Sequence, residues 1–187
     1  MAHEWVFDSG ARLTVAAADR LGEDVVRVHA EDTHRILRAA IPTHVPDRTP
    51  ALAATLRAAA AHRPAAQGTI RFHAAQAARP AWIEAIVYDF DRDPPCDRAV
   101  IERALDRIVA IAVERSCAAI ALPIDFGCPH GGIGGEEWLE ILLASLVECR
   151  ANAHAPPEIA LIVAPPDLAA SVRRVATFLN DHGVSSA

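Results

Sequence analysis

The sequence has no lysine, and its acidic residues outnumber its basic ones. All 18 basic residues of the 187 are arginine, which indicates the coding bias of a GC-rich gene and carries no functional signal. The 24 acidic residues give a formal net charge of −6 and a pI near 5.8. A protein dedicated to nucleic acid needs a basic field that displaces the counterions of the phosphate backbone. We therefore expect no nucleic-acid partner, although backbone N–H groups can still hold a single nucleotide.

The sequence also lacks paired cysteines and long apolar runs. Its four cysteines are scattered without a CxxC pair, which is typical of a reduced cytoplasmic protein. Cys128 and His130 lie close together, but a zinc site built on them lacks two further ligands, so no metal is predicted. No run of 18 apolar residues is free of charge, and the first residues, MAHEWVFDSGARL, lack the basic and apolar regions of a secretory signal. We expect a cytoplasmic protein with no membrane contact.

The sequence does contain enough apolar material for one core. Hydrophobic residues make up 52% of the chain, and its length suits a single domain spanning residues 1–187. Apolar runs and alternation predict strands at 4–8, 12–18, 25–30, 68–75, 82–90, 118–124 and 158–165. Helical periodicity and capping residues predict helices at 51–62, 96–116, 136–154 and 166–183. This alternation predicts an α/β fold, a three-layer α/β/α sandwich with a mixed, mostly parallel sheet.

One turn is unusually rich in glycine. Five of the nine glycines lie in the segment 125–135, DFGCPHGGIGG, between a predicted buried strand and a predicted helix. In open α/β sheets, ligands bind beyond the carboxyl ends of the strands. Glycines let the N–H groups of a helix N-terminus approach a phosphate closely, which predicts a site for a phosphorylated ligand. A structural turn remains the alternative, because Glu136 and Glu137 at the start of the helix would repel an anion.

Catalytic residues are not identifiable in this segment. Asp125, Cys128 and His130 supply the side chains of an acid–base or Cys–His site. However, Cys128 and His130 flank a proline, and neighbouring loop positions seldom direct both side chains to one point. A buried thiol and a surface imidazole are the alternative.

The middle and C-terminal parts of the chain resemble the macro domain, the module that binds ADP-ribose and also stands at the amino end of leucyl aminopeptidases. The similarity runs from about Gly68 to Leu179. Within it, the segment 118–127, AAIALPIDFG, is similar to an apolar strand of the family that ends in a proline and a turn of small residues. The glycines that follow precede a helix beginning with glutamates, as in the family. The resemblance implies a macro-domain-like fold.

The resemblance also implies a ligand and the residues that hold it. In the family, the glycine turn wraps the diphosphate and distal ribose of ADP-ribose, and an early aspartate holds the adenine amine. Asp19 stands at a compatible distance for that aspartate, and Asp32 ends the segment in the slot of the family's Asn-Ala-Ala-Asn. The ligand-binding residues that we predict are Asp19, Asp32, Asp125, Gly127, Gly131, Gly132, Ile133, Gly134 and Gly135.

Three functions follow from these observations. The first is a domain that binds ADP-ribose or a related nucleotide or phosphorylated metabolite at the glycine turn, without a further cofactor. The second is a macro-like interaction or homo-oligomerisation module without ligand or catalysis, because the family's two asparagines and its other glycine loop are replaced here. The third is a hydrolase of ADP-ribose derivatives or phosphoesters in which Asp32 or Asp125 activates water.

Overall fold

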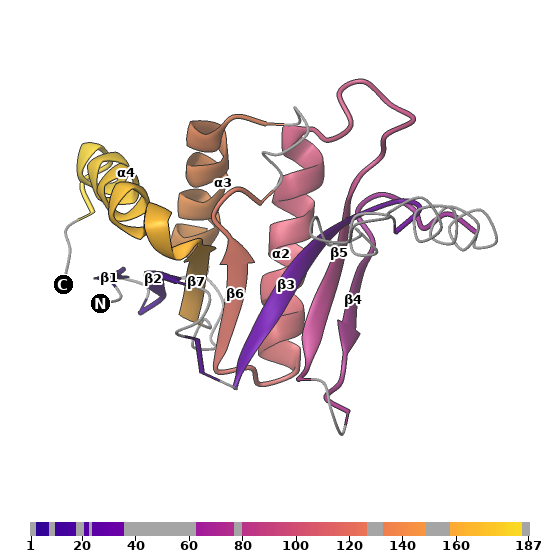
Figure 1. Ribbon diagram of the computed structural model, residues 1–187, viewed down its shortest axis with the longest axis horizontal. Coiled ribbons are helices and arrows are strands. Elements are labelled where there is room, and N and C mark those ends of the chain that lie inside the picture. Colours follow the sequence, from indigo (N-terminus) through magenta and orange to yellow (C-terminus); the bar gives the residue numbers. More distant parts are fainter. Residues whose placement is uncertain are drawn as a thin grey trace, which may run out of the picture.

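The computed structural model describes residues 3–7, 10–17, 21–22, 24–35, 63–76, 80–126, 133–148 and 158–184. Within them the chain forms one seven-stranded sheet and a layer of helices (Figure 1). The strands are β1 (His3–Val6), β2 (Arg12–Ala17), β3 (Val25–Asp32), β4 (Ile70–His73), β5 (Trp82–Tyr88), β6 (Ala119–Pro123) and β7 (Glu158–Val163). The helices are α2 (Arg98–Glu114), α3 (Gly135–Glu148) and α4 (Leu168–Asp181), with a short 3-10 helix, η4 (Pro165–Asp167), before α4.

The sheet is mixed and mostly parallel, as the sequence predicts. Its strand order is β1-β2-β7-β6-β3-β5-β4. The five central strands run parallel to one another, and the edge strands β1 and β4 are antiparallel to their neighbours. Gly10, with a φ of +83°, turns the chain between β1 and β2, and its N–H donates to the Phe7 carbonyl at 2.8 Å. The sequence-based fold class is therefore confirmed for the sheet.

Local chemistry explains where the described elements begin and end. α2 starts after Asp97, whose carboxylate accepts a hydrogen bond from the Val100 N–H at 2.9 Å. α4 stops before Gly183, which has a φ of +77°. The strand predicted at 68–75 spans only Ile70–His73, and it starts later than predicted because Gly68 has a φ of +85° that a strand does not adopt. The helix expected at 51–62 lies outside the described residues.

The three described helices form one layer. α2 packs against α3 and β5, and α4 packs against α3 and β2. In Figure 1, α4, α3 and α2 follow one another across the sheet in that order. In the part of the chain that the structure describes, no helix is both long enough and apolar enough to cross a bilayer.

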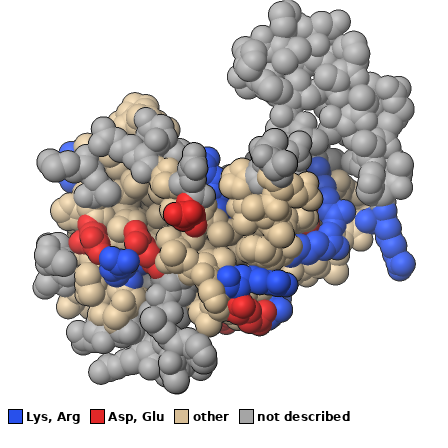
Figure 2. Space-filling view, turned by 90° about the horizontal axis from the view of Figure 1, so that it is seen from below, with Lys and Arg blue, Asp and Glu red and all other residues tan. Residues whose placement is uncertain are grey.

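The two faces of the sheet differ in chemistry. The residues that join the helices in the core are Val26 and Val28 of β3 and Ile83, Ala85 and Val87 of β5. Successive side chains of a strand point to opposite faces. The residues between them therefore lie on the other face, where Arg27, His29 and Glu84 are polar or charged. In the view from below, arginine side chains are most frequent on the right, the side of β3, β5 and β4, while most acidic side chains lie to the left (Figure 2).

Candidate functional site

The carboxyl ends of the parallel strands meet at one edge of the sheet, and predicted site residues follow two of them. β3 ends at Asp32, and Asp125 follows the last residue of β6 by two positions. Ile133 and Gly134 lead into α3, which begins at Gly135 and follows β6. These residues therefore belong to one edge, and their part in ligand binding stays a prediction. Four further predicted residues lie outside the described ones: Asp19, Gly127, Gly131 and Gly132.

The turn that leaves β3 is held by a buried carboxylate. Asp32 is only 1% exposed, and its Oδ1 accepts a hydrogen bond from the His34 N–H at 2.7 Å. The Asp32 carbonyl accepts another from the Arg35 N–H at 2.9 Å. Arg35 has a φ of +57°, a left-handed conformation that is uncommon for a residue with a side chain. One role of the Asp32 carboxylate is therefore to fix this turn and the direction in which the chain continues.

Two buried hydrogen-bonding groups at this edge have no hydrogen-bond partner among the described residues. Thr33 follows Asp32 and is 7% exposed, and its hydroxyl oxygen makes no hydrogen bond. Trp138, in the first turn of α3, is fully buried, and its indole N–H is likewise without a partner. The Trp138 ring lies 5.4 Å from the ring of Phe126, three residues after β6, which places the indole at the same edge. A buried polar group without a partner costs about 1–3 kcal/mol, so each of them requires an explanation.

The N-terminus of α3 carries charges of both signs. The first N–H groups of a helix have no partner within the helix and give its start a partial positive charge. Glu136 and Glu137 lie in this first turn. Arg174 of α4 lies against it as well, since a Cβ on Gly135 would stand 3.4 Å from the Arg174 guanidinium. That guanidinium offsets part of the negative charge of the two glutamates.

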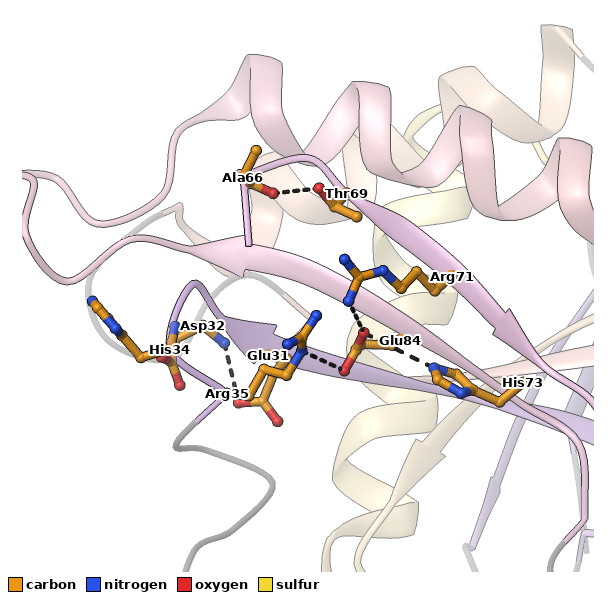
Figure 3. Close-up of polar contacts among 9 residues, drawn as sticks. All are labelled: Glu31, Asp32, His34, Arg35, Ala66, Thr69, Arg71, His73 and Glu84. Atoms are coloured by element: carbon orange, nitrogen blue, oxygen red, sulfur yellow. Dashed lines mark hydrogen bonds and ion pairs between the residues drawn. The ribbon is translucent and has the colours of Figure 1, made fainter. Parts of the chain in front are cut away.

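A second set of polar side chains, which the sequence did not reveal, surrounds Glu84 on the sheet face that is turned away from the helices. The Glu84 side chain is 5% exposed and sits in the middle of β5. Its Oε1 lies 3.2 Å from Arg35 Nε, and its Oε2 lies 3.3 Å from an Arg71 guanidinium nitrogen (Figure 3). His73 Nε2 lies 3.9 Å from the same Oε2. We call Glu84, Arg35, Arg71 and His73 the Glu84 cluster.

The imidazole of the Glu84 cluster is held by an aromatic neighbour. His73 of β4 pairs with Trp82 of β5 in the antiparallel ladder. The two rings stack with centroids 3.8 Å apart and an interplanar angle of 1°. This stack fixes the imidazole plane beside Glu84, while His73 Nε2 is buried and makes no hydrogen bond. The only signal of this cluster in the sequence is Glu84 itself, an acidic residue in the otherwise apolar run of β5. Its partners come from separate segments, so the sequence does not show that they meet.

Metal-ligating side chains do not gather in the described segments. Among these residues, no group of three or more histidine, cysteine or acidic side chains could hold a metal ion.

Sequence comparison finds no match for this chain. No protein-family model matches it, and no curated protein matches it either.

Comparison with solved structures does find matches. The macrodomain of Oceanobacillus iheyensis with ADP has a TM-score of 0.61 and 13% identity, covering 97% of this chain and 98% of the other. A Trypanosoma brucei macrodomain in complex with ADP has a TM-score of 0.54 and 13% identity, covering 88% and 68% of the two chains. The macro domain of ganglioside induced differentiation associated protein 2 has a TM-score of 0.59 and 11% identity, covering 91% and 85%. At these identities the likeness concerns the fold, and the chain therefore has a macrodomain-like fold.

Proposed function

We propose that the chain binds ADP-ribose or a related phosphorylated nucleotide at the carboxyl edge of its sheet. The observation that carries this proposal is the likeness of nearly the whole chain to macrodomains solved with nucleotides. One Oceanobacillus iheyensis structure is described as being with ADP, and a variant of the same macrodomain as being with ADPR. In an open α/β sheet the carboxyl edge is the usual ligand position.

The two unpartnered groups at this edge support the proposal. The Thr33 hydroxyl can donate and accept a hydrogen bond, and the Trp138 indole N–H can donate one. A nucleotide offers phosphate oxygens, ribose hydroxyls and base nitrogens as partners. A ligand that supplied even one of these partners would remove the cost of leaving a buried group unsatisfied.

Charge at the same edge also suits a phosphorylated ligand. The first turn of α3 attracts anions through its N–H groups, and Arg174 adds a full positive charge beside Gly135. Asp125 is exposed at the same edge and can accept hydrogen bonds from ribose hydroxyls or an amino group. Glu136 and Glu137 work against a phosphate, so Arg174 is the residue that makes a diphosphate acceptable there.

Gly134 offers a clean test. A Cβ built on Gly134 meets no atom of the described residues within 4 Å, so the side chain of Gly134→Val begins in open space among them. A valine there would block close approach of a phosphate to the start of α3. We expect calorimetric titration with ADP-ribose to give saturable binding to the native chain and about tenfold weaker binding or worse to the variant, a loss of about 1.4 kcal/mol or more.

Gly22 supplies the matched control. A Cβ built on it also meets no atom of the described residues within 4 Å, and Gly22 lies just before β3, at the opposite edge of the sheet. Gly22→Val should therefore bind ADP-ribose as the native chain does. Absence of heat with ADP-ribose and with a panel of nucleotides would reject the proposal and favour an interaction module without a ligand. Equal ADP-ribose affinity of both variants would show that the ligand does not bind at the N-terminus of α3.

A further inference from the structure

We propose that the Glu84 cluster is a second anion site, which binds the phosphate group of a small molecule between Arg35 and Arg71. The cluster lies on the face of β3, β5 and β4 that is turned away from the helices. Glu84 pairs in register with His29 of β3, three residues before Asp32. At 3.3 Å per residue, Glu84 lies about 10 Å back from the carboxyl edge, and Arg35 reaches it from the turn that follows β3.

The charges of the cluster do not balance. One carboxylate, on Glu84, faces two guanidinium groups, so these three side chains carry one surplus positive charge before His73 is counted. The buried carboxylate of Glu31, on the same face of β3, accepts a hydrogen bond from the Asp32 N–H at 3.1 Å. Arginine is always protonated in proteins, so the surplus is permanent. Two like charges drawn to one carboxylate repel each other, and an anion between them would relieve that repulsion.

The donors of the cluster are also far from used up. A guanidinium carries five N–H donors. In the described part of the chain, the side chains of Arg35 and Arg71 make no hydrogen bond or ion pair other than those to Glu84. Their side chains are 31% and 45% exposed, so the remaining donors can be reached from solvent.

The carboxylate positions both arginines. Each Glu84 oxygen receives a different guanidinium, and both side chains approach Glu84 from the same side of the sheet in Figure 3. Arg35 is further fixed by the turn that places it at positive φ. Two guanidinium groups held in this way match a tetrahedral oxyanion, which can accept hydrogen bonds from both at once. Phosphate suits the pair better than a carboxylate does, because its tetrahedral set of oxygens can accept from both guanidinium forks at once.

Titration with inorganic phosphate tests the site directly. The side-chain NMR signals of His73 and Trp82 report on the cluster, because the two rings stack beside Glu84. We expect saturable shifts of these signals in the native chain, and an approximately tenfold weaker response in Arg71→Gln. Arg71→Lys, which keeps the charge but loses the planar fork, should fall between the two.

Arg107 supplies the matched control. It is an exposed arginine with one carboxylate partner, Glu114 at 2.9 Å, and it lies on α2. Arg107→Gln should leave the phosphate titration unchanged. Equal weakening by Arg107→Gln and Arg71→Gln, or shifts that grow linearly without saturation, would show only general charge attraction and overturn the proposal.

Two further arms identify the ligand and separate the sites. Sulfate should compete with phosphate, and acetate at the same concentration should compete far less; equal competition by acetate would overturn the preference for a tetrahedral oxyanion. A sugar phosphate that binds at least tenfold more tightly than free phosphate would identify a phosphorylated metabolite as the ligand. Equal binding of the two would identify inorganic phosphate as the ligand and would contradict the proposal of a small molecule that carries the phosphate. Gly134→Val should retain the phosphate response at His73, so a failure of nucleotide binding and a failure of this site are distinguishable.

Discussion

Two charged clusters in this molecule have the same layout with opposite signs of charge. In one, the buried carboxylate of Glu84 lies between two arginines. In the other, the exposed guanidinium of Arg98 lies between two carboxylates, Glu102 at 2.7 Å and Glu140 at 3.1 Å. The second set is about half exposed throughout, whereas Glu84 is 5% exposed.

Burial decides what each cluster can do. Water screens the exposed cluster, so its ion pairs contribute little beyond holding the Arg98 side chain and raising the pKa of its guanidinium through the hydrogen bonds to Glu102 and then Glu140. Glu84 is shielded from water and needs its arginines whenever the protein is folded. Each cluster has two arginine–carboxylate ion pairs, but the pairs of the buried Glu84 restrict their side chains more than the exposed pairs of Arg98 do. The constrained cluster is therefore the better candidate for a binding role.

Removing the central carboxylate should have the largest effect on stability. Glu84→Ala leaves two arginines beside each other and a small hole in the sheet face. We expect a loss of about 2 kcal/mol in the free energy of unfolding, below the value for a fully buried pair because both arginines reach solvent. Urea denaturation measures it. Glu140→Ala, which removes one carboxylate of the exposed cluster, should leave the unfolding curve in place; equal shifts in the two variants would break the comparison.

Thr33→Val removes a buried hydroxyl that, unlike the Glu84 carboxylate, has no hydrogen-bond partner among the described residues. The two side chains have nearly the same shape, so the free energy of unfolding should stay within about 1 kcal/mol of the native value or rise. Binding of ADP-ribose, in contrast, should weaken by roughly five- to tenfold if the hydroxyl contacts the ligand. Calorimetry and urea denaturation on one preparation give both numbers. A destabilised variant with native affinity would assign Thr33 a purely structural role.

Salt should sharpen the contrast between the clusters. At 1 M salt the screening length falls to about 3 Å, which weakens exposed pairs much more than buried ones. The stability difference between the native chain and Glu84→Ala should therefore persist from 0.1 to 1 M sodium chloride. Urea denaturation at both concentrations is the measurement. Its disappearance at high salt would mean that Glu84 is solvated like Glu140.

Cys117 extends the comparison to a neutral group, with the smallest expected effect. Burial raises the pKa of its thiol, and the nearby charge of Arg115 lowers it by less. Because the folded-state pKa lies above the unfolded one, the protonated thiol contributes stability at neutral pH that is lost as the pH rises through the folded-state pKa. Alkylation of Cys117, followed by peptide mass spectrometry, should be slower in the native than in the urea-unfolded chain at neutral pH. The two rates should converge at higher pH, and equal rates at neutral pH would contradict the account.

Local patterns in the sequence predicted most helices and strands and the carboxyl edge of the sheet as the ligand position. Features that depend on pairing between distant segments could not be predicted. The apolar repeat along α2 and Gly183 after α4 are signals carried by a few neighbouring residues. Alternating strands and helices placed the segment 125–135 at the carboxyl edge, and the resemblance to macro domains pointed to Asp32. The sequence could not reveal the Glu84 cluster, which depends on the register of Arg71 opposite Glu84 and on a turn that returns Arg35 to β5.

The unpartnered groups were hidden for another reason. Thr33 and Trp138 are ordinary residues in the sequence, and their significance comes from burial without a partner. Burial of this kind results from contacts between separate segments, such as the Trp138 ring against Phe126 and the Thr33 N–H on the Tyr88 carbonyl, which no local pattern records. The resemblance to macro domains pointed to the right fold, although neither of these residues belongs to the motifs that carried it.

The most direct test of the proposed nucleotide site is the indole N–H signal of Trp138 in an NMR titration with ADP-ribose. Trp5 is buried in β1, outside the carboxyl edge, and serves as an internal control in the same spectra. The account predicts a saturable shift of the Trp138 signal while the Trp5 signal stays in place. An unchanged Trp138 signal at saturating ADP-ribose, or no response of any signal at millimolar ligand, would contradict it.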